Sequence, residues 1–193
     1  MSEKRFAITG GIGSGKSVVS HLLTIMGVPV YDCDSRARQL MEEDSYIHQG
    51  LVRMFGEECY DCEGHLNRKW LASRIFVDKD AVQRVNALVH PRVKADFVEW
   101  ADAQSNPVVG VETAILFESG INEEVDRTLL VWADKETCIK RVEGRNGMTR
   151  QQIINRMANQ MSLDDLLLLC DYNICNDNEK AVFPQLQEFL EML

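Results

Sequence analysis

Residues 6–17 read FAITGGIGSGKS: an apolar run with β character passes into a glycine-rich turn, and a helical pattern starts at Ser17. Gly10, Gly15, Lys16 and Ser17 match the pattern G-x-x-x-x-G-K-[ST] of a phosphate-binding loop. Glycines allow successive backbone N–H groups to point inward around an anion, and the helix start adds unpaired amides and the positive end of its dipole. The pattern therefore predicts binding of a nucleoside triphosphate, rather than a chance match of a glycine-rich turn.

Two side chains of this stretch have separate tasks in phosphoryl transfer. Lys16 supplies a mobile cation for the β- and γ-phosphates, and Ser17 supplies a hydroxyl for Mg²⁺. The residues that we expect to bind the nucleotide are Gly11, Ile12, Gly13, Ser14, Gly15, Lys16, Ser17 and Val18.

Length and composition describe an ordinary globular chain. Its 193 residues suit one domain, and 45% of them are hydrophobic and 26% charged. A formal net charge of −9 argues against a broad nucleic-acid or membrane-surface footprint. No apolar run reaches the length that spans a bilayer, and the N-terminus runs straight into the strand before the loop. We therefore expect a cytoplasmic protein with neither nucleic acid nor membrane as a partner; the oligomeric state is left open.

The six cysteines raise the possibility of a zinc site. Cys59 and Cys62 form a C-x-x-C pair with His65 close behind, but the other four cysteines form no second pair at that spacing. Reduced, mostly incidental thiols are favoured over zinc.

Strand and helix patterns alternate along the chain, which predicts an α/β fold with a mostly parallel sheet covered by helices on both faces. After the strand that precedes the loop, strands are expected at 28–31, 107–111 (with 114–117 as an apolar continuation), 127–133 and 172–175. Helices are expected at 17–26, 35–43, 45–54, 67–77, 80–89, 91–104, from 135 onward, 149–160, 163–169 and 179–193. The all-helical block between strands is expected to be an insertion that forms one wall of a substrate cleft.

Asp32 and Asp34 come just after the second expected strand. Ligands of open parallel sheets bind beyond the carboxyl ends of the strands, so both carboxylates would lie near the γ-phosphate if the first two strands are close. Alternation along an extended segment would send both to the same side. Asp34 could accept a proton from an acceptor hydroxyl, or it could simply cap the next helix. A Mg²⁺ role is the competing use of this pair.

Basic residues offer further candidates. Arg141 and Arg145 share one helix face, where their mutual repulsion makes sense if a triphosphate lies between them; a solvated basic face is the alternative. The glycines at 144 and 147 would let this region move as a lid. Arg36 and Arg38 could hold an acceptor phosphate or be solvated. His90 and Glu118 have structural alternatives as well.

Several segments, in order, resemble the dephospho-CoA kinase family. They are the loop 10–17, the segment 28–34 with Ala37 and Arg38, the stretch 55–68, Leu88-Val89-His90-Pro91-Arg92, Leu116-Phe117-Glu118-Ser119-Gly120, and the arginine pair. This chain departs from the family pattern at Val18, Ala114 and Asn146.

The resemblance implies a P-loop kinase that uses ATP and Mg²⁺ and transfers the γ-phosphate to the ribose 3′-hydroxyl of dephospho-CoA. It implies a core of about 1–44, 106–134 and 171–193, a helical acceptor-binding insertion of about 45–105, and a lid of about 135–170. The expected catalytic residues are Asp34 as the base, Lys16, Arg141 and Arg145, and the expected metal residues are Ser17 and Asp32. The expected substrate-binding residues are Thr9, Asp32, Asp34, Arg38 and His90.

Two other functions compete with this one. A kinase for nucleoside monophosphates would share the same loop. A nucleotide-gated switch would need a guanine-reading N-K-x-D segment late in the chain, and residues 176–178 (Asn-Asp-Asn) do not fit it.

Overall fold

The computed structural model of the chain describes residues 4–75 and 78–193. Two compact units make up this part of the chain. The first unit combines the chain up to Asp32 with Trp100–Leu193, and the second is Cys33–Glu99.

The first unit is built on a parallel sheet with the strand order β2-β3-β1-β4-β5. The strands are β1 (Lys4–Thr9), β2 (Val30–Asp32), β3 (Val108–Glu112), β4 (Arg127–Trp132) and β5 (Tyr172–Cys175). Because β1, β3 and β4 are covered by helices, they read as nearly continuous apolar runs rather than alternating ones. The predicted α/β fold with a parallel sheet flanked by helices is confirmed.

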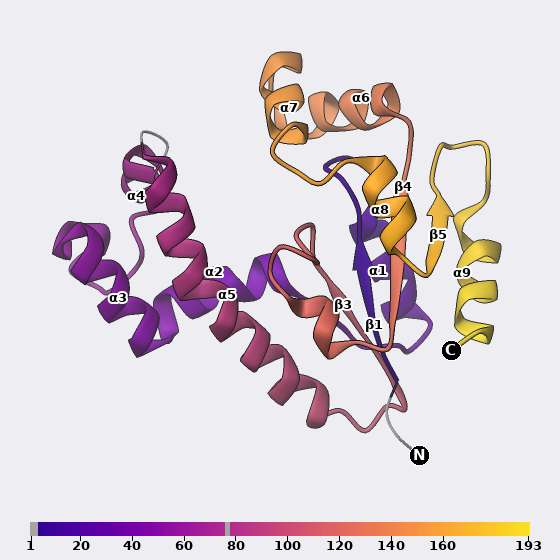
Figure 1. Cartoon of the computed structure of the whole chain (residues 1–193), viewed down its shortest axis with the longest axis horizontal. Coiled ribbons are helices and arrows are strands. Elements are labelled where there is room, and N and C mark those ends of the chain that lie inside the picture. The colour runs from indigo at the N-terminus through magenta and orange to yellow at the C-terminus, as the bar shows by residue number, and fades with distance from the viewer. Residues whose placement is uncertain (1–3, 76–77) are drawn as a thin grey trace. The chain divides into compact units, whose positions relative to one another are not determined.

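The first unit also contains the helices α1 (Lys16–Ile25), α6 (Lys135–Asn146), α7 (Arg150–Met157), α8 (Leu163–Leu169) and α9 (Val182–Glu191), with a short 3₁₀ turn η2 (Ile121–Glu124). Of these, α1, α8 and α9 pack against the sheet. Phe6 and Ile8 of β1 pack with residues of β4 and β5 against Leu23 of α1 and Phe189 of α9, in one fully buried cluster. Helix α8 packs against β4, and Figure 1 shows it in front of that strand with α1 behind.

Three predicted helix boundaries are confirmed by their capping contacts. Gly27 ends α1 with a positive φ of 85°, and its N–H donates to the Thr24 carbonyl at 3.1 Å. Asp134 begins α6 by accepting the Thr137 N–H at 2.9 Å. Thr149 begins α7 with a reciprocal capping box.

The second unit is helical. It contains α2 (Cys33–Glu43), α3 (Ser45–Phe55), the 3₁₀ turn η1 (Glu57–Cys59), α4 (Arg68–Ile75) and most of α5 (Lys79–Asp102). Arg36 forms a two-pronged ion pair with Asp96, both N···O distances being 2.8 Å, and this pair ties α2 to α5. The last two residues of the helix predicted at 67–77 lie outside the described residues. Within 4–75 and 78–193, no helix is both long and apolar enough to cross a bilayer.

The prediction of two helices at 80–89 and 91–104 is wrong, because Pro91 lies inside the single helix α5. An interior proline removes one backbone hydrogen bond and normally kinks or ends a helix. Here every fourth residue is buried on both sides of the proline, and this apolar stripe keeps the helix continuous. The buried residues are Ala81, Val85, Val89, Val93, Phe97 and Ala101.

The structure also corrects one smaller prediction about the sheet and two premises of the argument about Asp32 and Asp34. Residues 114–117 do not continue β3; the chain turns there, and Leu116 is apolar because its side chain is buried in the turn. The first two strands are not neighbours, because β3 lies between them. Asp32 and Asp34 do not share an extended segment, because helix α2 already begins at Cys33.

Candidate nucleotide-binding site

The loop between β1 and α1 has the backbone shape that its glycines predict. Gly13 and Gly15 have positive φ angles of 81° and 96°. A Cβ atom at Gly13 would lie 2.5 Å from the Cys138 carbonyl oxygen, and one at Gly15 would lie 2.1 Å from the Asn176 side-chain nitrogen. Only glycine fits these two positions, because the neighbouring atoms press directly on the loop.

The Lys16 side chain folds back onto this loop. Its Nζ donates to the carbonyl oxygens of Gly10 at 2.7 Å and Gly11 at 3.2 Å. The ammonium is therefore held beside the loop, where it can meet the β- and γ-phosphates of a bound nucleotide.

A carboxylate absent from the sequence-based predictions joins the site beside Ser17. Glu112 ends β3, and its Oε1 accepts the Ser17 hydroxyl at 2.9 Å. The parallel register places Glu112 opposite Ile8 of β1 on one side and Asp32 of β2 on the other. A hydroxyl and a carboxylate side by side are the hard oxygen ligands that Mg²⁺ prefers, so the donor set fits that ion.

Arg141 of α6 connects the loop to the end of β5. Its Nη2 donates to the Asn176 carbonyl at 2.8 Å and to Asn178 Oδ1 at 2.7 Å, and its Nη1 donates to the Ser14 carbonyl at 3.4 Å. Asn176 in turn donates from Nδ2 to the same Ser14 carbonyl at 2.8 Å. Arg141 thus fixes the wall of the nucleotide site by its contacts with backbone and amide oxygens.

Arg145 lies one turn further along α6, where its side chain is exposed. Helices α6 and α7 pack against each other through Ile139, Val142 and Ile153, and Ile12 of the loop packs against this small core. The two helices are therefore one hairpin that touches the phosphate loop.

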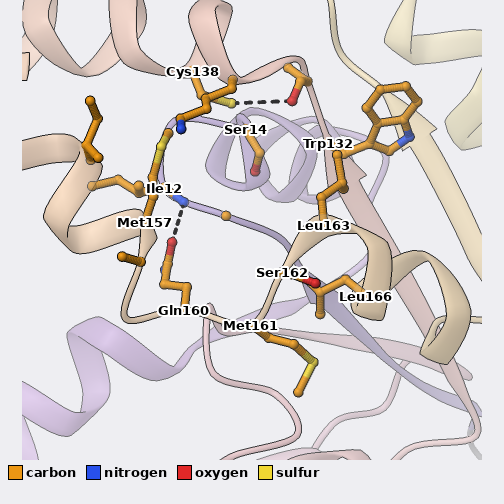
Figure 2. Close-up of a pocket in the computed structure, with 15 residues that line it drawn as sticks. Ile12, Ser14, Trp132, Cys138, Met157, Gln160, Met161, Ser162, Leu163 and Leu166 are labelled. Atoms are coloured by element: carbon orange, nitrogen blue, oxygen red, sulfur yellow. Dashed lines mark hydrogen bonds between the residues drawn. The ribbon is translucent and has the colours of Figure 1, made fainter.

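A largely apolar cavity of about 390 Å³ lies between the loop, the end of β4 and the α7–α8 connection (Figure 2). Its lining includes Ile12, Ser14, Trp132, Met157, Gln160 and Leu166. The Ile12 N–H donates to Gln160 Oε1 at 2.9 Å across one side of it. Cys138 also lines the cavity, and burial raises the pKa of its thiol.

The segment after β5 is held by Asp177. Its Oδ1 accepts the N–H groups of Glu179 at 2.9 Å and Lys180 at 3.0 Å. These two bonds, with a third from the Cys175 thiol, lower the pKa of Asp177 to about 2. The carboxylate is therefore charged at neutral pH and keeps the segment next to Arg141 in shape.

The predicted acceptor residues are distributed between the two units. Asp34 and Arg38 lie in the second unit, exposed and one turn apart on α2, so they share a helix face. His90 is half-buried in the middle of α5. Asp32 belongs to the first unit and is exposed at the end of β2.

Three of the remaining candidates differ in how exposed their side chains are. Thr9 is fully buried, and its hydroxyl has no hydrogen-bond partner among the described residues. Val18 is 55% exposed on α1, and Glu118 is exposed in the turn after β3.

The two cysteines of the C-x-x-C pair differ in exposure, since Cys59 is buried and Cys62 is exposed. In the described ranges no group of three or more His, Cys, Asp or Glu side chains is arranged to hold a metal ion.

Glu112, Asn176 and Gln160 are the functional candidates that sequence reasoning missed. Glu112 had a usable signal, because it is an acidic residue that directly ends an apolar strand, VVGVE, of a parallel sheet. Asn176 and Gln160 had none, because their partners lie 162 and 148 residues away in the sequence.

Comparison with known proteins identifies similar chains over almost the whole length. The family model described as CoaE, dephospho-CoA kinase, matches residues 5–181. A dephospho-CoA kinase of Bacteroides fragilis (strain YCH46) is 40% identical over 190 residues, covering 98% of this chain and 92% of that protein.

Solved structures agree with the fold. A crystal structure of a Thermus thermophilus protein superimposes with a TM-score of 0.83 and 31% identity, covering 100% of this chain and 96% of that one. A dephospho-CoA kinase from Campylobacter jejuni superimposes with a TM-score of 0.69 and 22% identity, covering 97% and 94%; at that identity the likeness concerns the fold.

Proposed function

This chain belongs to the dephospho-CoA kinase family, and from that premise we propose how its residues transfer the γ-phosphate of ATP to the ribose 3′-hydroxyl of dephospho-CoA. Its activity is dephospho-CoA kinase activity, the final step of CoA biosynthesis, and the kinase family implies the use of ATP. The observation that carries the proposal is the phosphate loop, with Lys16 arched over it and Ser17 hydrogen-bonded to Glu112.

In the proposed reaction the 3′-hydroxyl oxygen of the acceptor bonds to the γ-phosphorus, and the bond from that phosphorus to the β–γ bridging oxygen breaks. The hydroxyl proton passes to the carboxylate of Asp34, and ADP is released. The protein mainly positions these groups and neutralises charge, as in other phosphoryl transfers. The support for Asp34 is its exposed carboxylate in the first turn of α2.

Lys16 and the loop of residues 11–18 hold the β- and γ-phosphates in this proposal; the Ile12 N–H donates to Gln160 and is not counted among the phosphate donors. The support is the positive φ angles of Gly13 and Gly15 and the two carbonyl contacts of the ammonium. Charge that grows on the β–γ bridging oxygen during transfer is then balanced by a cation that is already in position.

Mg²⁺ is proposed to be held by Ser17, with Glu112 and Asp32 at the neighbouring strand ends. The support is the hydroxyl–carboxylate pair and the register that aligns the two acidic residues. A bound magnesium ion would neutralise charge on the β- and γ-phosphate oxygens.

On the acceptor side we propose that Arg38 and His90 contact dephospho-CoA and that the helical region of about 45–105 binds it. Arg38 has the stronger support, because it shares a face of α2 with Asp34. Arg36 is a structural residue instead, since its guanidinium is paired with Asp96. A direct contact between Thr9 and the acceptor would need the neighbouring loop to move, because its hydroxyl is buried.

Residues of about 135–170 are proposed to act as a lid that brings Arg145 to the transferring phosphoryl group. The support is the exposed position of Arg145 on a hairpin that contacts the loop through Ile12. Arg141 is proposed to hold the nucleotide site rather than to reach the acceptor, because its donors face oxygens of the loop and of the segment after β5.

We further propose that the enzyme works in the cytoplasm. The support is that all six cysteines are free thiols, as is usual in a reducing compartment.

The test is mass spectrometry of a reaction of the purified chain with ATP and dephospho-CoA. We expect the acceptor to gain one phosphate, and digestion of the product should locate it on the ribose 3′-oxygen. Nucleoside monophosphates run in parallel should remain unchanged. Phosphorylation of a monophosphate in preference to dephospho-CoA would contradict the proposal, and so would release of ADP at the same rate without any acceptor.

A further inference from the structure

Gln160 makes one contact with the phosphate loop that the reaction proposed above does not use. Its Oε1 accepts the Ile12 N–H at 2.9 Å, and Figure 2 shows this bond at the edge of the cavity. Gln160 stands in the turn after α7, where its own N–H donates to the Met157 carbonyl at 3.1 Å. The turn belongs to the proposed lid, so the bond joins the lid to the loop.

The Ile12 side chain makes a second connection between the same two parts. It packs against the small core of the α6–α7 hairpin, which is formed by Ile139, Val142 and Ile153. One residue of the loop is therefore held by the hairpin through its side chain and by the following turn through its backbone. If the proposed lid moves, the phosphate loop must therefore move with it, unless both of these contacts break.

The contact lies close to the place of the transferring phosphoryl group. A Cβ atom on Gly11 would be 3.8 Å from Gln160 Oε1, and the Gly11 carbonyl accepts the Lys16 ammonium at 3.2 Å. Lys16 marks the position of the β- and γ-phosphates. The Gln160 carboxamide therefore stands beside the part of the loop on which the reacting phosphate rests.

We propose that Gln160 is a positioning residue for phosphoryl transfer. By accepting the Ile12 N–H it fixes the first half of the phosphate loop and makes the loop and the lid close as one body around ATP. The inference rests on the function proposed above, and it assigns to Gln160 a role in closure and not in proton transfer or direct charge neutralisation.

A carboxamide suits this position better than the side chains nearest to it in shape. Methionine would fill the same volume without a strong acceptor, so it would remove the bond and keep the packing. Glutamate would keep an acceptor for the Ile12 N–H but would bring a negative charge next to the polyphosphate. Gln160→Met therefore tests the loss of the hydrogen-bond acceptor, and Gln160→Glu tests the addition of a negative charge.

The experiment compares Gln160→Met and Gln160→Glu with the wild-type enzyme. Gln151→Met is the matched control, because Gln151 is an exposed glutamine of α7 whose Nε2 donates to Asn155 at 2.9 Å and which does not line the cavity. Hydrogen exchange of the Ile12 amide is measured by NMR without substrates. Steady-state kinetics then give kcat, KM for ATP, and the ratio of ADP released to CoA formed.

In Gln160→Met we expect the Ile12 amide to exchange about tenfold faster and kcat to fall by about tenfold, the factor that one hydrogen bond supplies. KM for ATP should change by less than about threefold, because the remaining loop amides still bind the nucleotide. The ratio of ADP to CoA should rise above one, since a lid that closes loosely admits water. Gln160→Glu should keep slow Ile12 exchange and should raise KM for ATP. Gln151→Met should match the wild type throughout.

Two results would overturn the proposal. Unchanged Ile12 exchange in Gln160→Met would mean that the contact does not hold the loop. Faster exchange with unchanged kcat and an unchanged ratio would mean that the contact is structural only. If Gln160→Met does not fold, Gln160→Ala gives the same two readings. Failure of the wild-type enzyme to phosphorylate dephospho-CoA would refute the proposed function and would leave the exchange measurement to decide on the contact.

Discussion

Single side chains in the first unit divide into those that hold the loop and those that face its ligands. Arg141 and Asn176 hold the loop, because their donors are used on the Ser14 carbonyl and on oxygens after β5. Lys16 and the Ser17–Glu112 pair are the residues that we propose face the nucleotide and a magnesium ion, with a cation and hard oxygen atoms. At this scale the two groups differ in chemistry: the first donates to carbonyl and amide oxygens that shape the loop, and the second carries the cation and oxygen atoms that suit a polyphosphate and Mg²⁺.

The first residue-scale prediction concerns the proposed base. Asp34→Asn removes the proton acceptor and keeps the shape, so kcat should fall by about 10²–10⁴ while the Kd for ATP stays within about twofold. Coupled assay of ADP release and titration with a fluorescent ATP analogue measure the two quantities. Asp80→Asn, at the exposed start of α5, is the control and should remain active. Near-normal turnover of Asp34→Asn would exclude Asp34 as the base.

The second residue-scale prediction concerns the proposed magnesium ligand Glu112. Glu112→Gln keeps an acceptor for the Ser17 hydroxyl but removes the negative charge that favours a nearby Mg²⁺. We expect half-maximal activity to need about tenfold more Mg²⁺, with unchanged thermal stability. A Mg²⁺ titration at saturating ATP measures the shift, and Glu191→Gln in the last turn of α9 should leave it unaltered. An identical titration curve for Glu112→Gln would place Glu112 outside the metal site.

At the scale of an element, α5 shows how burial overrides a local signal. Pro91 predicts a helix boundary, yet the helix continues because residues four apart are buried along its length. The proline still lowers the free energy of unfolding, because its ring clashes with the carbonyl four residues before it and it has no N–H to bond there. Burial of the apolar stripe offsets this loss.

That cost can be measured by Pro91→Ala. Alanine restores the missing N–H and removes the clash, which stabilises the folded protein. Part of this stabilisation is cancelled, because the unfolded chain with alanine has more conformational entropy than the chain with proline. We expect the free energy of unfolding to rise by about 1–2 kcal/mol. Urea denaturation measures it. Pro184→Ala is the control, because Pro184 lies in the first turn of α9, where no interior hydrogen bond is missing. An equal or lower stability of Pro91→Ala would mean that the helix needs the proline at this position.

At the scale of the molecule, the parallel sheet brings the nucleotide site together from distant segments. The strand order puts β1 between β3 and β4, so the phosphate loop emerges beside Glu112 and the end of β4. The segment after β5 closes the other side, with Asp177 fixing its shape. Because this segment also holds Arg141, we expect its order to affect both stability and nucleotide binding.

The pH dependence of unfolding tests this part of the fold. The pKa of Asp177 is lowered from 3.8 to about 2 in the folded protein, chiefly by the N–H groups of Lys180 and Glu179. Its carboxylate therefore stabilises the fold above pH 3.8, and that contribution is lost as the pH falls from 3.8 toward 2.

We expect Asp177→Asn to unfold at lower urea than the wild type at pH 6, and the difference between them to shrink below pH 3.8. Urea titrations from pH 6 to pH 3 measure it. Asp164→Asn, which changes an exposed aspartate of α8, gives the reference curve. A difference that stays constant over this range would mean that the Asp177 carboxylate does not stabilise the segment through its charge.

Most of the fold could be predicted from local patterns. The strand at 172–175 and the capping box at Thr149 agree with the sequence-based prediction, because each depends on residues close together in the chain. The errors occur where a distant contact decides the outcome. Pro91 stays inside a helix because of a buried stripe, and Leu116 is apolar in a turn because it is buried. The same distinction separates Lys16, which the motif predicts, from Gln160, which it does not.

The phosphate-binding loop, the α/β fold and the resemblance to one family of kinases can all be recognised from the amino-acid sequence, because glycines, a lysine and a serine at fixed spacing encode that loop locally. The contact of Glu112 with Ser17, the contacts of Arg141 and Asn176 with Ser14, and the bond between Gln160 and Ile12 become visible in the folded molecule alone. Each of these contacts joins segments between about 95 and 162 residues apart, and strand order and helix packing, not local spacing, bring such segments together.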